Sequence, residues 1–256
     1  MEATGPRLFF MHIPKTAGSS LRRMLEAAPA TAGRCCWLKT GDPAADAPRL
    51  PCLETALVTG GHVRWDDAAV LPGGWQMITV LRDPLDRLLS LYSFQKMQIA
   101  LGARTEASPV LRRELETRSF EDLAHDPAAR FFRFTLPTQT LYLGGAPRGF
   151  IPARGTEVDA AAIAPVLDLA MERLEKTAWL GVTESLDRDL ETLAATFGWE
   201  TLGPSRRTNQ TTMEHRLRVT DLEPETAAAL RARLSPDYAL LARAREIAAA
   251  RHAAAV

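Results

Sequence analysis

The chain has 256 residues, 46% of them hydrophobic and 24% charged, and its 31 basic residues balance its 31 acidic ones. This composition is typical of a soluble globular protein that can bury a full core. The net charge of zero excludes a bulk attraction to nucleic acid or to anionic membranes, so any anion site has to be local. No apolar run reaches the length of a membrane span and no secretory signal is visible, which predicts a cytoplasmic protein.

The first predicted strand runs from Leu8 to Ile13, where an almost unbroken apolar stretch suits a strand covered on both faces of a parallel sheet. A helix follows, and Ser19 or Ser20 is its expected cap. The small residues from Lys15 to Gly18 leave backbone N–H groups at the positive end of that helix, and Lys15 adds a full charge. This turn is therefore a candidate anion site.

Residues 27–53 are rich in Ala, Pro, Gly and Asp without a clear period, so we expect a surface loop there. Cys35, Cys36 and Cys52 are an odd number in an apparently intracellular chain, which favours free thiols over a disulfide. A zinc site formed by these thiols with His62 is disfavoured, because the adjacent pair has a poor chelating spacing, and we expect no metal.

Two further strands are predicted at Ala56–Thr59 and Trp75–Leu81, and polar residues follow both. The second strand leads to His62 and the third to Arg82, after which Asp83 and Pro84 are expected to start a long helix that reaches about Ile99. Ligands bind beyond the carboxyl ends of strands in an open parallel sheet. We therefore expect Lys15, His62 and Arg82 to lie together at the edge of the sheet where the carboxyl ends of the strands meet, which we call the rim.

The rest of the chain is predicted to be mostly helical. Helices are expected at Val110–Thr117, Phe120–His125, Thr138–Leu143, Asp159–Lys176 and Thr183–Phe197, with a fourth strand at Ala178–Val182 and two terminal helices that begin near Pro224 and Ser235. Alternating strands and helices favour an open, mostly parallel sheet with helices on both faces, and we predict one domain over residues 1–256. Leu240, Leu241 and Ile247 should pack against this domain or against a second subunit of a homodimer.

The lysine turn does not follow the Walker P-loop pattern, which places glycines before the lysine. Here Pro14 precedes Lys15, and Gly18 follows it. A phosphotransferase of that class is therefore disfavoured, although the same turn could still bind a phosphate. A solvated lysine in an ordinary turn is the alternative.

Two motifs together resemble those of sulfotransferases that use 3′-phosphoadenosine 5′-phosphosulfate (PAPS). They are H-I-P-K-T-A-G-S-S at residues 12–20 and V-L-R-D-P-L-D-R-L-L-S-L-Y at residues 80–92. The sequence is most similar to the carbohydrate branch that includes the heparan sulfate 2-O-sulfotransferases, and G-H at residues 61–62 agrees with that branch. The resemblance implies an α/β fold with a P-loop-like nucleotide site.

The resemblance also implies roles for particular residues. The 5′-phosphosulfate would be bound by Lys15, Thr16, Ala17, Gly18, Ser19 and Ser20, the 3′-phosphate by Arg82 and Ser90, and the nucleotide would be covered by a loop containing Arg206, Arg207, Thr208 and Asn209. For the last segment a polar surface loop is an equal alternative. Arg87, one turn before Ser90, is expected either to touch the nucleotide or to form a salt bridge.

His62 is the expected general base, because a histidine after this strand has that role in the similar family and imidazole titrates near neutral pH. Lys15 would stabilise charge on the leaving phosphate oxygen. His12 is expected to be structural or to touch the phosphosulfate. The sequence thus predicts transfer of a sulfuryl group from PAPS to a hydroxyl of a glycan or another small acceptor. The nucleotide product would be adenosine 3′,5′-bisphosphate (PAP). An inactive protein that only binds PAP is the main alternative.

The acceptor is not identified by the sequence. Carbohydrate members of the similar family work behind a membrane anchor, and no anchor is visible here, so a polymeric glycosaminoglycan acceptor is in doubt. Trp65 is expected either to stack on a sugar ring or to pack in the protein. Phe131, Phe132 and Phe134 could line an acceptor pocket, but aromatic clusters more often form a satellite core.

Overall fold

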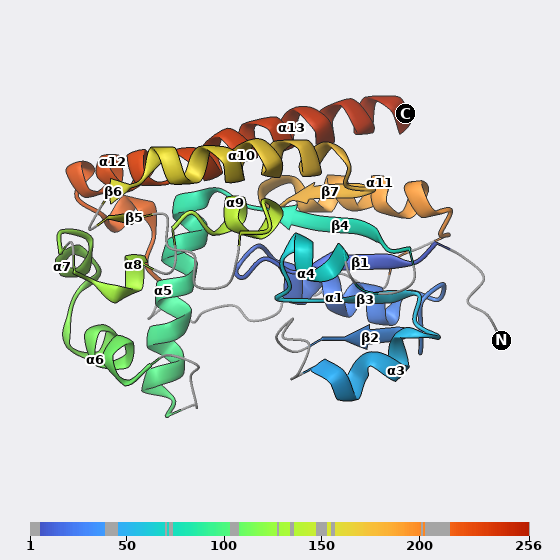
Figure 1. Cartoon of the computed structure of the whole chain (residues 1–256), viewed down its shortest axis with the longest axis horizontal. Coiled ribbons are helices and arrows are strands. Elements are labelled where there is room, and N and C mark those ends of the chain that lie inside the picture. The colour runs from blue at the N-terminus through green and yellow to red at the C-terminus, as the bar shows by residue number, and fades with distance from the viewer. Residues whose placement is uncertain are drawn as a thin grey trace.

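We describe the protein from a computed structural model of the chain. The structure describes residues 6–38, 46–69, 71, 74–102, 108–126, 128–133, 136–146, 153–154, 157–200, 202 and 216–255. Its centre is a parallel five-stranded sheet with helices on both faces, so the predicted α/β fold class is confirmed (Figure 1). Among the described helices, none is long and apolar enough to cross a membrane.

The sheet has the strand order β2-β3-β1-β4-β7. The strands are β1 (Leu8–Met11), β2 (Cys35–Trp37), β3 (Val58–Gly61), β4 (Gln76–Leu81) and β7 (Trp179–Val182). After β1 the chain fills one side of the sheet with β2 and β3, and it then crosses to the other side to form β4. The loop after β1 therefore lies at the point where the strand order reverses, which is where ligands bind in sheets of this kind.

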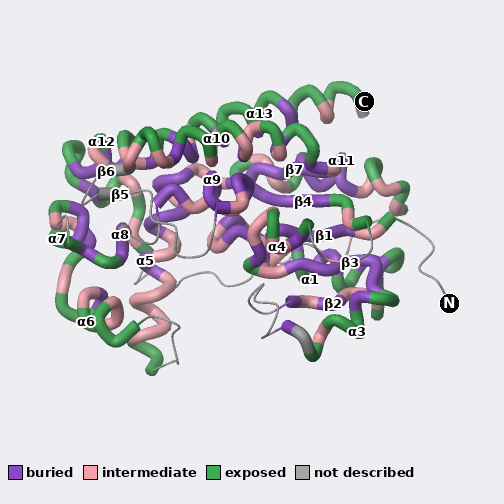
Figure 2. Tube along the Cα trace, viewed as in Figure 1, coloured by how far each residue is buried: buried purple, intermediate pink, exposed green. Residues whose placement is uncertain are grey.

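Side chains of β1 point alternately to the two faces of the sheet, as the pleat requires. Phe9 and Met11 pack in a core with residues of the helices α4, α9, α10 and α13. Leu8 and Phe10 pack on the opposite face with residues of α1 and α11. These helices are α1 (Gly18–Ala27), α4 (Trp65–Ala69), α9 (Thr138–Leu143), α10 (Ala160–Glu175), α11 (Leu186–Phe197) and α13 (Ser235–Ala255). Both faces of β1 are thus buried, as its apolar sequence predicts (Figure 2).

A group of helices stands beyond the carboxyl ends of the strands and has a core of its own (Figure 1). It consists of α5 (Pro84–Ala100), α6 (Pro109–Thr117), α7 (Phe120–Ala124), α8 (Arg130–Arg133) and α12 (Pro224–Arg233). Phe131 and Phe132 belong to this core, so the satellite-core alternative is confirmed for both. Phe134 lies outside the described residues. The short strands β5 (Ala153–Arg154) and β6 (Glu157–Val158) form an antiparallel pair.

Most predicted elements are present with shifted ends. Asp83 caps α5 by accepting a hydrogen bond from the Asp86 N–H at 3.0 Å, as expected. Thr183 was expected to cap α11, but it begins the short 3-10 helix η2 (Thr183–Ser185), and its hydroxyl donates to the Leu81 carbonyl. Leu240, Leu241 and Ile247 pack in the sheet core against α10 and β7, as predicted.

The expectation of a loop over residues 27–53 was wrong. This segment contains the edge strand β2, the 3-10 helix η1 (Ala47–Arg49) and the short helix α3 (Leu50–Leu53). Strand β2 has only three residues, and its place is set by pairing with β3, where Cys36 lies opposite Thr59. Local sequence could not show this strand because its pairing partner is distant along the chain.

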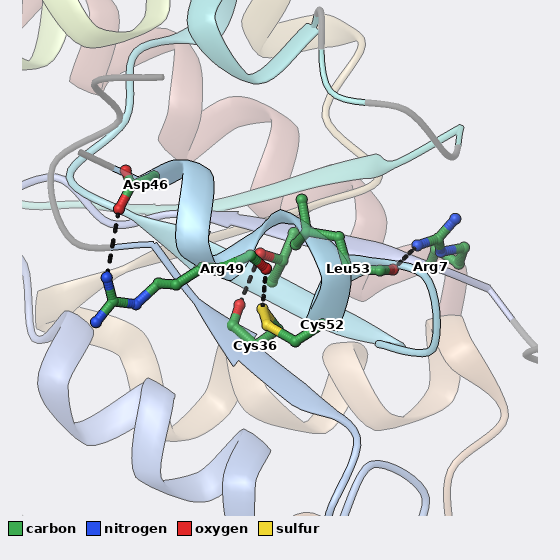
Figure 3. The surroundings of a disulfide bond; sticks show 7 residues. Arg7, Cys36, Asp46, Arg49, Cys52 and Leu53 are labelled. Atoms are coloured by element: carbon green, nitrogen blue, oxygen red, sulfur yellow. Dashed lines mark hydrogen bonds and ion pairs between the residues drawn. A yellow bond between two sulfur atoms is a disulfide. The ribbon is translucent and has the colours of Figure 1, made fainter. Parts of the chain in front are cut away.

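The expectation of free thiols was also wrong for two of the three cysteines. Cys36 and Cys52 form a disulfide whose Cα atoms are 6.0 Å apart, within the range that such a bond spans. Figure 3 shows α3 folded back over β2, with Arg7 bound to the Leu53 carbonyl. The edge strand is therefore held to α3 by a covalent bond. Cys35 keeps a free thiol, and burial is the main cause that raises its pKa to about 11.

We expect thiol counting to show this arrangement. The unfolded, unreduced protein should have one reactive thiol, and reduction should expose all three cysteines. Because the bond closes a loop of 16 residues, reduction should lower the free energy of unfolding by about 3 kcal/mol. Cys52→Ala is the matched control, and its unreduced, unfolded chain should have two thiols. Three thiols in the unreduced wild-type chain would contradict the disulfide.

Candidate active site

The turn after β1 has the backbone shape of an anion site. Lys15 and Ala17 both have positive φ, 72° and 63°, and Thr16 between them does not. Such alternation turns successive N–H groups toward one point, forming a concavity that binds anions. The N–H groups of Thr16, Ala17 and Gly18 donate to no backbone carbonyl among the described residues. The Thr16 hydroxyl donates to the Ile13 carbonyl at 2.9 Å and holds the turn together.

The start of α1 corrects the predicted cap. Ala17 occupies the N-cap position with left-handed backbone and makes no side-chain cap, while Ser19 and Ser20 lie in the first turn of the helix. Non-glycine residues adopt this conformation at a cost of about 1 kcal/mol. Two such residues in one short turn therefore store strain, which is common at functional sites. The six residues from Lys15 to Ser20 form this turn and the first residues of α1, and their binding of a phosphosulfate stays a prediction.

His12 is a partly buried, neutral imidazole beneath this turn. Its ring stacks on Phe10 with centroids 5.4 Å apart, and a Cβ atom at Gly18 would lie 2.0 Å from the ring. Only glycine therefore fits at position 18. Burial, followed by the charges of His62 and neighbouring cations, lowers the pKa of His12 to about 3. His12 is thus uncharged at neutral pH, which agrees with the expected structural role.

His62 follows β3 and is exposed at the same rim of the sheet. Its Nδ1 lies 2.8 Å from the His12 carbonyl oxygen, and the two imidazole rings have centroids 4.5 Å apart. A carbonyl oxygen can only accept a hydrogen bond, so Nδ1 of His62 carries the proton. The lone pair of the neutral ring is then on Nε2. This tautomer leaves Nε2 able to accept a proton from a bound molecule.

Arg82 follows β4 and reaches the lysine turn, as the sequence predicts. Its Nη1 donates to the Lys15 carbonyl oxygen at 3.1 Å. Burial is the largest effect on its pKa and lowers it, the nearby Asp86 and Glu184 carboxylates raise it, and Arg216 lowers it. An arginine remains charged under these influences. Lys15, His62 and Arg82 therefore all lie at the carboxyl edge of neighbouring strands.

Lys15 is a partly buried cation next to a second cation. Its Nζ lies 3.9 Å from the ring centroid of Phe94, on α5. Burial and, to a smaller extent, Arg82 lower the pKa of Lys15 to about 8. A bound anion would oppose both effects, because its negative charge would favour the charged form of Lys15.

Ser90 lies on the side of α5 that faces the turn. It is one helical turn after Asp86, whose charge acts on Arg82, and one turn before Phe94, which contacts Lys15. Residues four apart share a helix face. Ser90 therefore shares a helix face with Asp86 and Phe94, and its binding of the 3′-phosphate stays a prediction. Arg87 is on the buried side of the helix, where Asp237 is its main favourable charge, which agrees with the structural alternative.

Arg206, Arg207, Thr208 and Asn209 lie outside the described residues. Arg216, which sequence reasoning missed, follows that segment and is close enough to Arg82 to lower its pKa. Its signal in the sequence was only a further basic residue in the same polar stretch. Sequence reasoning also missed Gln139, whose side chain is hydrogen-bonded to the backbone of Arg82. A glutamine within a short helix has no recognisable motif.

The sequence also made predictions about Trp65 and about metal binding. Trp65 is partly buried and packs against the sheet core, with the Arg173 guanidinium 5.6 Å from its ring centroid, so the packing alternative has structural support. No group of three His, Cys, Asp or Glu side chains in the described part of the chain is placed to hold a metal ion.

Comparison with protein-family models and with curated proteins gives no match. Among solved structures, this chain is similar to one described as "Crystal Structure of Sulfotransferase from Alicyclobacillus acidocaldarius". The two are 18% identical, the match covers 92% of this chain and 94% of that one, and the TM-score is 0.48. A likeness at this level carries no functional argument, so the function proposed below rests on the residues of the site.

The partly buried, neutral His12 should make the protein sensitive to acid. The folded pKa of His12 is about 3 and the ordinary value is 6.5, so between these values the unfolded chain binds one more proton. The free energy of unfolding should therefore decrease as the pH is lowered from about 6.5 to about 3, and this group should contribute about 1.4 kcal/mol per pH unit. His12→Phe should reduce the slope by that amount in urea titrations. An unchanged slope would contradict the lowered pKa of His12.

Proposed function

We propose that this protein is a sulfotransferase that moves a sulfuryl group from PAPS to a hydroxyl of a small acceptor. The observation that carries the proposal is the meeting of Lys15, His62 and Arg82 at one rim, with Arg82 donating to the Lys15 carbonyl. Two cations and a turn of backbone N–H groups suit a nucleotide with phosphates at both ends. The motifs at residues 12–20 and 80–92, which contain Lys15 and Arg82, support the same function.

His62 would act as the general base. Its Nε2 would accept the proton of the acceptor hydroxyl while that oxygen attacks sulfur, and the His12 carbonyl would hold the Nδ1–H throughout. The bond that forms joins the acceptor oxygen to sulfur, and the bond that breaks joins sulfur to the 5′-phosphate oxygen. PAPS supplies the activated sulfuryl group for this displacement. No redox partner is required.

Lys15 would stabilise the phosphate oxygen that leaves sulfur with the electron pair of the broken bond. The N–H groups of residues 16–18 would bind the same phosphate. Arg82 and Ser90 would hold the 3′-phosphate of the nucleotide, on the side of the rim that β4 and α5 form. We further propose that Arg216 contributes charge there, and that residues 206–209 close over the nucleotide.

A hydroxylated metabolite or a small glycan remains the proposed acceptor, without nucleic acid as a partner, and a homodimer remains an expectation. We also keep one domain over residues 1–256 and the cytoplasm as expectations. The Cys36–Cys52 disulfide opposes a cytoplasmic location, because such bonds persist mainly in oxidising compartments.

Ligand binding and transfer test the proposal together. PAP should raise the melting temperature more than ATP or ADP does, because only PAP has both the 5′- and the 3′-phosphate that the rim would bind. His62→Ala should lower transfer from labelled PAPS to acceptors in cell extract by about 10²- to 10⁴-fold and leave PAP binding intact. His125 is an exposed histidine at the end of α7. His125→Ala is the matched control and should keep full activity.

Stabilisation by ATP without stabilisation by PAP would favour a phosphotransferase and reject the proposal. Tight PAP binding without transfer to any acceptor would favour the inactive nucleotide-binding alternative. Unchanged transfer in His62→Ala would remove His62 from the role of base.

The pKa of Lys15 predicts how PAP binding depends on pH. Lys15 carries its charge below about pH 8 in the free protein and loses it above. PAP affinity should therefore be constant near neutrality and fall by about tenfold per unit above pH 8, measured by calorimetry. Lys15→Met should bind PAP more weakly and show no such fall. A wild-type affinity that is flat up to about pH 9.5 would contradict the lowered pKa.

A further inference from the structure

The side chain of Gln139 holds the backbone of Arg82 with both halves of its amide. Its Oε1 accepts from the Arg82 N–H at 2.9 Å, and its Nε2 donates to the Arg82 carbonyl oxygen at 2.9 Å. Gln139 is fully buried, and it is 57 residues from Arg82 in the sequence. These two bonds fix the peptide groups on either side of the Arg82 Cα atom. They therefore also fix the direction in which its side chain leaves the backbone.

Gln139 is itself held by a buried carboxylate. Asp237, at the start of α13, accepts from the Gln139 N–H at 3.1 Å and from the N–H and hydroxyl of Thr140, both at 2.7 Å. The carboxylate thus occupies the N-terminal end of α9, where a negative charge is favoured. Burial raises the pKa of Asp237, and the buried Arg87 on α5 and these hydrogen bonds oppose that rise. Residues of α5, α9 and α13 therefore meet in one buried polar network behind Arg82.

We propose that Gln139 is a positioning residue, which directs the Arg82 guanidinium toward the lysine turn and so sets the preference for a 3′-phosphorylated nucleotide. The inference rests on the proposed function, since it uses Arg82 as the 3′-phosphate ligand. Gln139 itself would not contact the nucleotide. It acts through the backbone of Arg82, whose guanidinium donates to the Lys15 carbonyl.

A purely structural role for Gln139 predicts a different result from a positioning role. Loss of stability alone would weaken all ligands of the site alike. Loss of Arg82 positioning would weaken only ligands that carry a 3′-phosphate. PAP and AMP separate these cases, because both have adenosine and a 5′-phosphate, and only PAP has the 3′-phosphate.

The test measures the affinities of PAP and AMP for the full chain by calorimetry. Wild type should prefer PAP, and Gln139→Met should lose about tenfold of that preference while AMP binds as before. Thr177→Val is the matched control, because it removes a buried hydroxyl hydrogen bond at the opposite end of the sheet. It should lower the melting temperature and keep the wild-type preference.

Gln139→Glu is the second variant, in case the methionine chain does not fold. Its carboxylate can still accept from the Arg82 N–H but opposes the Arg82 carbonyl, so the preference for PAP should fall here too. The inference would be overturned if a folded Gln139 variant kept the wild-type preference for PAP over AMP. It would also be overturned if the variant lost affinity for PAP and AMP equally. Equal affinities of wild type for PAP and AMP would instead contradict the proposed function itself.

Discussion

The pairing of β1 along both of its edges is the constraint on which the site depends. Met11 lies opposite Gly61 of β3 and opposite Thr79 of β4, so the three strands leave the sheet close to one level. The segments that follow them carry Lys15, His62 and Arg82. These side chains come together because the strands are parallel and adjacent, although more than 60 residues separate Lys15 from Arg82. A shift in strand register would separate them without changing any of their identities.

Two basic side chains, Lys15 and Arg82, lie close together at this rim. Burial lowers the pKa of both Lys15 and Arg82, and Arg82 lowers the pKa of Lys15 further. Burial also keeps His12 neutral beneath them. Burying like charges is costly unless something compensates for them. An anion bound in the turn would supply that compensation. The strained backbone at Lys15 and Ala17 agrees with this interpretation, since its cost is recovered only when the N–H groups have an acceptor.

Sequence reasoning reached the sheet and the three rim residues because both depend on local patterns. The apolar run of β1, the Asp83–Pro84 helix start and the polar residues after each strand are readable from neighbouring positions. It failed for β2, whose three residues are strand only because β3 lies beside them. It also failed for the Cys36–Cys52 bond and for Gln139. Both depend on distant segments that meet only in the folded chain, and neither leaves a spacing that could be recognised.

The buried carboxylate of Asp237 has a consequence for how the protein is made. It lies on the last helix, yet it holds α9 in the middle of the chain and acts on Arg87 of α5. The strands β1, β3 and β4 are synthesised before α13, so the network behind Arg82 stays incomplete until α13 has emerged. The rim is therefore finished only at the end of synthesis. Truncated products would contain the lysine turn without the backbone support of its partner arginine.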